Sequence, residues 1–65
     1  MNLTERLLKL KELINTIAAQ NELADEVVTK THRSLHALYD SGKLPTHVVY
    51  GDDGDFHFIF KLKEE

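Results

Sequence analysis

Apolar side chains recur at alternating steps of four and three residues through the first 41 residues of the chain. Spacing of this kind places the side chains along one stripe of a helix. Asn2, three residues before Glu5, supplies a capping box, and Gly42 suits the position just after a last helical turn. The pattern therefore predicts helix over most of residues 3–41, with a seam formed by Leu3, Leu7, Leu10, Ile14, Ile17, Asn21, Ala24, Val28, Thr31, Leu35 and Leu38.

Asn21 leaves two interpretations of this helical region open. It can cap a second helix whose first turn carries the negative charges of Glu22, Asp25 and Glu26. It can also be the one polar residue in the seam of a continuous coiled coil, where a buried Asn fixes register. The apolar stripe is wider than a two-stranded seam, which favours a helical hairpin over one long bent helix; the extra residues are Leu13, Leu23, Val27 and Tyr39.

The remaining residues predict a β-hairpin. Residues 46–50 and 56–62 are rich in β-branched and aromatic side chains, and the Gly- and Asp-rich segment 51–55 separates them. A loop over residues 52–54 puts Gly54 in the left-handed position of a bulged turn. This register pairs Tyr50 with Phe56, Val48 with Phe58 and Thr46 with Phe60, and it turns these residues and Leu62 towards the helices. The expected fold is a single α+β domain over residues 1–65.

The opposite face of the predicted hairpin is unusually apolar for two strands open to water. It carries His47, Val49, His57, Ile59, Lys61 and Lys63. An exposed apolar patch on a small protein often marks an interaction site. We therefore expect Val49, Ile59 and His57, together with Tyr39 on the helices, to contact a partner protein.

Composition favours self-association and a soluble, cytoplasmic protein. A chain of 65 residues buries a small core, and this one has no cysteine for disulfides or for a Cys-based zinc site, so a homodimer is expected. The net charge of −3, with dispersed basic residues, argues against general nucleic-acid binding. Charged residues interrupt every apolar stretch, so no membrane association is expected.

Motifs for catalysis, cofactors and metals are absent or weak. Neither Ser34 nor Ser41 sits beside a base in a strained turn, and no glycine-rich phosphate loop exists, so we expect neither an enzyme nor a cofactor. His32 and His36 have the i, i+4 spacing of a zinc pair, and His47 and His57 could add ligands if the hairpin folds over them. The chain has no Cys, and no acidic residue lies inside the pair as in a metalloprotease motif, so we expect no metal. The acidic turn lacks the twelve-residue ligand pattern of an EF-hand.

Residues 35–44 (LHALYDSGKL), followed by a hairpin, resemble the end of the recognition helix and the wing of a winged helix-turn-helix domain. Residues 23–27 are similar to the helix that precedes it. The chain departs from that pattern between Ala24 and Leu35, which are about three residues closer than usual, and at Val28, where glycine is common. The resemblance implies DNA binding, with Lys30 and Arg33 as contacts.

The sequence as a whole favours a small, non-enzymatic module for protein–protein interaction. We expect a homodimer that occludes or bridges a partner protein, as an inhibitor, a phage-type host factor or an adaptor does. The alternative is a winged-helix-like, DNA-binding transcriptional regulator.

Overall fold

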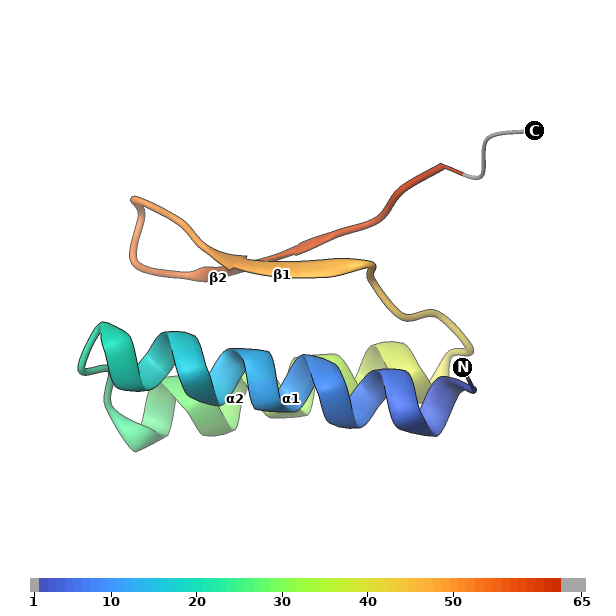
Figure 1. Cartoon of the computed structure of the whole chain (residues 1–65), viewed down its shortest axis with the longest axis horizontal. Helices are drawn as coiled ribbons and strands as arrows, with labels where there is room; N and C mark the ends of the chain where they lie inside the picture. Colours follow the sequence, from blue (N-terminus) through green and yellow to red (C-terminus); the bar gives the residue numbers. More distant parts are fainter. Residues whose placement is uncertain (1, 63–65) are drawn as a thin grey trace.

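Two helices and a two-stranded antiparallel sheet follow one another along the chain, in a computed structural model that describes residues 2–62. Helix α1 (Leu3–Gln20) and helix α2 (Asp25–Asp40) run in opposite directions, and the hairpin of β1 (His47–Tyr50) and β2 (Phe56–Ile59) lies over one side of them (Figure 1). The predicted α+β fold, a helical hairpin followed by a β-hairpin, is confirmed.

The ends of α1 explain why the seam does not continue as one helix. Asn2 Oδ1 accepts the backbone N–H of Glu5 at 2.8 Å, as the capping pattern predicted. At the other end Glu22 adopts a left-handed conformation with φ +53°, and the N–H of Leu23 donates to Ala18 O at 2.9 Å. This is a Schellman-type helix end, and it turns the chain away from the axis of α1.

Asn21 does not cap α2, so that interpretation was wrong. It is the C-cap of α1, and its side-chain Nδ2 donates to Ile17 O at 2.9 Å. The N-cap of α2 is Ala24, which has no side-chain oxygen to accept a hydrogen bond. The two residues between Asn21 and Ala24, Glu22 and Leu23, reverse the chain direction.

Helix α1 is the central element of the core. Both α2 and β1 pack against it. Partly buried side chains from α2 and β2 pack against the core: Val28, Tyr39, Phe56 and Phe58. The buried hydrophobic residues are Leu7, Leu10, Ile14, Ala18, Leu35, Leu44 and Val48.

Arg6 fixes the connection between α2 and β1 onto the start of α1. Its Nη2 donates to Leu44 O at 2.8 Å and its Nε donates to Pro45 O at 3.1 Å. Hydrogen bonds from a charged group are stronger than those between neutral groups. The guanidinium group therefore sets where the hairpin starts relative to α1.

The turn and the inner strand pairs form as predicted. Tyr50 pairs with Phe56 and Val48 pairs with Phe58. The loop closes with a 2.8 Å hydrogen bond from Gly51 N–H to Asp55 O, and Gly54 has φ +83°, the left-handed value expected at this bulge position.

The far end of the hairpin differs from the prediction. Thr46 N–H donates to Ile59 O at 2.8 Å, although Ile59 already pairs with His47, so two residues of one strand lie opposite one of the other. This β-bulge ends the pairing, and β2 stops at Ile59 instead of reaching residue 62. Thr46 therefore does not pair with Phe60.

Phe60 and Leu62 do not pack on the helices, and that prediction was wrong. They are 53% and 93% exposed, because the chain leaves the sheet after Ile59 and runs away from the helical layer (Figure 1). The predicted position of Lys63 lies outside the described residues.

Candidate interaction surface

The side of the hairpin that faces away from the helices carries His47, Val49, His57 and Ile59, which we call the outer sheet face. Strand alternation puts them there, since Val48 between them is buried and Phe56 and Phe58 pack against the core. Val49 is 41% exposed and Ile59 is 38% exposed. Val49 pairs with His57 and His47 pairs with Ile59, so the two aliphatic side chains are diagonal neighbours.

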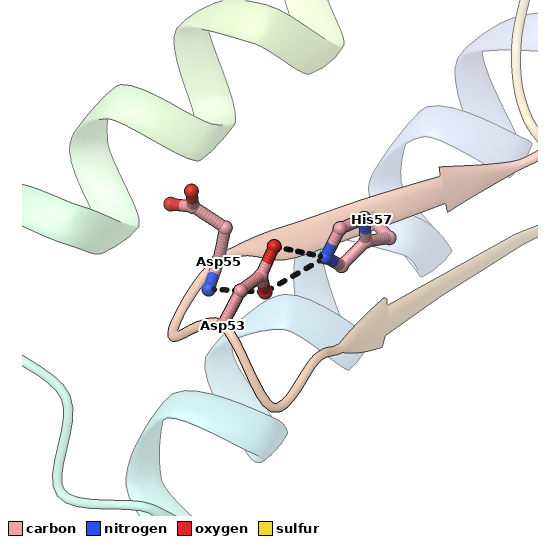
Figure 2. Close-up of polar contacts among 3 residues, drawn as sticks. All are labelled: Asp53, Asp55 and His57. Atoms are coloured by element: carbon pink, nitrogen blue, oxygen red, sulfur yellow. Dashed lines mark hydrogen bonds and ion pairs between the residues drawn. The ribbon is translucent and has the colours of Figure 1, made fainter.

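A histidine and an aspartate close the turn end of this face. His57 Nε2 lies 2.9 Å from Asp53 Oδ1 and 3.0 Å from Asp53 Oδ2, and the N–H of Asp55 donates to Asp53 Oδ1 at 3.2 Å (Figure 2). The hydrogen bond with Asp53, and then the charge of that carboxylate, raise the pKa of His57 above 6.5. The same hydrogen bond lowers the pKa of Asp53 below 3.8. The pair therefore favours a charged imidazolium beside Val49.

Gly51 provides the space for this pair. A Cβ atom at Gly51 would lie 2.6 Å from ring atoms of His57 and 2.8 Å from Asp53 Oδ1. Any larger residue would push the imidazole away from the carboxylate. The glycine thus leaves room for the His57 ring to reach the Asp53 carboxylate.

An apolar strip follows β2 and extends past its end. We define the β2 strip as Phe56 and Phe58 of β2 together with Phe60 and Leu62, the next two alternate residues beyond its end. The first two are half-buried against the core, and the last two are exposed. The molecule therefore covers only part of this strip.

The structure brings three of the four expected contact residues together. Val49, His57 and Ile59 share the outer sheet face. Tyr39 lies on the other side of the sheet, in α2, where it packs against the core and its hydroxyl is 3.0 Å from Thr4 Oγ1. A contact between these residues and a partner stays a prediction.

The paired histidines of α2 are in different environments. His32 is half-buried, and its Nε2 is buried without a hydrogen-bond partner. Burial, and then the nearby charge of Lys11, lower the pKa of His32 below 6.5. His36 is exposed, with Nε2 3.3 Å from Lys11 Nζ. Within residues 2–62, no three His, Cys, Asp or Glu side chains are grouped so as to hold a metal ion.

Lys30 and Arg33 lie on the exposed side of α2. With Glu26 and Thr29 they line an open surface depression. Glu26 places a negative charge among the two cations. Neither helix in the described part of the chain is long and apolar enough to cross a bilayer.

The role of Asp53 was missed by the sequence analysis, which treated it only as a turn residue. The sequence did contain a pattern that could have indicated the pair: a bulged turn over residues 52–54 followed by His57 as the second residue of the next strand. Such a turn folds the aspartate back over that strand. Side-chain direction at the turn was needed to see the pair (Figure 2).

No protein-family model matches the chain, and no curated protein or solved structure matches it significantly.

Proposed function

We propose that this chain is a small, non-enzymatic interaction module that forms a homodimer and binds a partner protein through its outer sheet face. The partner is occluded or bridged by this contact, which is how an inhibitor, a phage-type host factor or an adaptor acts. The observation that carries the proposal is the exposure of Val49 and Ile59 as neighbours on the sheet surface.

The chemistry of this face supports protein binding. Aliphatic side chains at the centre of a patch, with polar groups at its edge, are typical of protein interfaces. Here His47 and the His57–Asp53 pair flank the aliphatic centre, and they supply polar groups that a partner can match. The acidic net charge of −3 favours a partner surface with basic residues.

Charge substitutions on the outer sheet face test the proposal. We expect the double variant Val49→Lys/Ile59→Lys to lose a partner that the wild-type chain retains in affinity purification from its source cells, because two charges would be desolvated on binding. Leu8→Lys/Leu13→Lys is the matched control, since both leucines are exposed on α1 and the variant adds the same two charges. Circular dichroism verifies that both variants fold. Equal retention of the partner by the double variant would contradict the proposal.

A winged-helix-like, DNA-binding transcriptional regulator is the second candidate. It is supported by the exposure of Lys30 and Arg33 on α2, the helix that directly precedes the hairpin. Binding of this kind would retard duplex DNA at about 50 mM salt and would weaken steeply with added salt. Lys30→Ala/Arg33→Ala would abolish the retardation. An unchanged DNA mobility with the wild-type chain rejects this candidate.

A further inference from the structure

We propose that two copies of this chain pair along the free edge of β2, antiparallel to each other, and join their hairpins into one four-stranded sheet. The inference rests on the proposed homodimer and deepens it, since it names the edge, the register and the residues of the interface. The strand order would be β1, β2, then β2 and β1 of the partner.

The hydrogen-bond pattern of the hairpin decides which backbone groups are available. The bond from Gly51 N–H to Asp55 O makes these two residues a hydrogen-bonded pair. In an antiparallel ladder such pairs alternate with pairs whose N–H and C=O groups point outwards. Val49 and His57 therefore bond each other across the hairpin, whereas the backbone groups of Phe56 and Phe58 point away from β1.

The edge of β2 is more open than the edge of β1. Strand β1 packs on α1, and its residue Val48 is only 2% exposed, so its outward backbone groups are covered. The bulge formed by Thr46 and His47 lies at the start of β1, and bulges block pairing at a sheet edge. Strand β2 has neither feature: Phe56 and Phe58 are only partly buried, and Figure 1 shows the chain beyond β2 leaving the helical layer.

One register satisfies both the backbone and the side chains. With Phe58 opposite Phe58 of the partner subunit, Phe60 lies opposite the partner's Phe56. The backbone groups of Phe56 and Phe58 already point towards the other copy, and those of Phe60 do so once residues 60–62 continue β2 in the dimer. Phe60, which is 53% exposed in the monomer, then lies beside the partner's Phe56 on the core-facing side of the joined sheet, so the pairing removes part of its side chain from water.

Charge complementarity points to a second copy as the occupant of this edge. In the same register Lys61 lies opposite the partner's Asp55, twice per dimer, because the arrangement has two-fold symmetry. Lys61 is exposed. The Asp55 carboxylate points away from the Asp53–His57 pair, so it is available to this lysine (Figure 2). Cross-strand pairs of opposite charge stabilise a sheet, and like charges in the same place destabilise it.

A charge swap tests the register. We expect Lys61→Asp and Asp55→Lys each to raise the dimer Kd about tenfold, since two attractive pairs become two repulsive pairs. The double variant Lys61→Asp/Asp55→Lys should return to within about threefold of the wild-type Kd. The matched control is Lys61→Asp/Asp52→Lys, which has the same net charge but leaves Asp55 in place, and it should not recover. Sedimentation equilibrium measures all five Kd values.

Amide hydrogen exchange is a second readout, because it reports hydrogen bonding of individual backbone N–H groups and not side-chain charge. We expect the amides of Phe56, Phe58 and Phe60 to become protected as the protein concentration rises, while those of Val49 and His57 stay constant. The β2 pairing would be overturned if the wild-type chain dimerises but the double variant does not recover the wild-type Kd and the β2 amides gain no protection. The homodimer itself would still stand. A wild-type monomer at every concentration would overturn both, while partner binding through Val49 and Ile59 would remain.

Discussion

The Nε2 atom of His57 contacts both carboxylate oxygens of Asp53 across the hairpin turn, at 2.9 Å from Oδ1 and 3.0 Å from Oδ2. The pKa of His57 is raised, so its contribution to stability is complete below the unfolded value of 6.5 and is lost as pH rises through the higher folded value. The pKa of Asp53 is lowered, so its contribution is present above 3.8 and is lost as pH falls through the lower folded value. Both contributions are complete between pH 3.8 and pH 6.5, so the pair stabilises the hairpin most in that range.

The first prediction concerns Asp53→Asn. This change should lower the pKa of His57 towards 6.5, because the hydrogen bond and the charge that raise it are both reduced. Asp53→Asn should lower the free energy of unfolding more near pH 5 than near pH 8, because the contribution of His57 is lost at high pH in the wild-type chain as well. NMR titration of the His57 ring and urea unfolding at the two pH values measure these effects. Asp52→Asn is the control, and an equal shift of the His57 pKa in that variant would contradict the assignment to Asp53.

The second prediction concerns Gly51→Ala. The added methyl group would sit 2.6 Å from the His57 ring, so the ring must move away from Asp53. We expect the pKa of His57 to fall towards 6.5 and the pH dependence of stability to resemble that of Asp53→Asn. Adding Asp53→Asn to Gly51→Ala should then change the pKa of His57 little further, which the same NMR titration measures. A large further fall would mean that the ring still contacts the carboxylate.

The sequence alone predicted the elements that depend on residues close together in the chain. The heptad rhythm, Asn2 and Gly42 located the helical region, and Gly54 located the turn, because each of these residues acts on the backbone next to it. The strand register followed from the turn, since the loop length fixes which residues face each other.

Features that depend on tertiary geometry could not be predicted in this way. The end of β2 at Ile59 is caused by a bulge in the other strand, and the hydrophobic pattern of residues 60–62 gives no sign of it. The helix reversal uses a left-handed Glu22, a residue type with no preference for that conformation. Three of the four expected contact residues do share one face, because strand alternation is local, whereas the location of Tyr39 depended on helix packing.

The third prediction concerns Arg6, which connects α1 to the segment before β1. Arg6→Ala should lower the free energy of unfolding by about 2 kcal/mol, because two carbonyl groups lose a charged donor. Arg6→Lys should recover part of this loss, since lysine keeps the charge but not the two-pronged geometry. Urea unfolding measures both. Lys9→Ala, at an exposed position of the same helix, should cost less than about 0.5 kcal/mol, and a similar cost at both sites would contradict the proposed role of the guanidinium group.

The fourth prediction concerns Glu22, whose φ of +53° places it in the left-handed region at the end of α1. Glu22→Gly should raise the free energy of unfolding by about 0.5–1 kcal/mol, because glycine adopts this conformation without a Cβ clash and loses part of that gain through its larger unfolded-state entropy. Thermal unfolding by circular dichroism measures the change. Glu22→Ala removes the same charge but keeps the Cβ atom, so equal stabilisation by alanine would show that charge, and not backbone strain, is responsible.

The fifth prediction concerns His32, whose Nε2 is buried without a partner between α1 and α2. Burial and the charge of Lys11 lower its pKa and outweigh a hydrogen bond with the Lys11 backbone that raises it, so the unfolded chain takes up the proton first and stability falls as pH drops below 6.5. His32→Leu removes both the unpaired nitrogen and this proton uptake. It should raise the free energy of unfolding by about 1 kcal/mol at pH 8, and by more at pH 5. Urea unfolding at both pH values measures the gain, and His36→Leu, at an exposed position, should not show it. A gain for His32→Leu that is smaller at pH 5 than at pH 8 would mean that His32 is protonated in the folded protein.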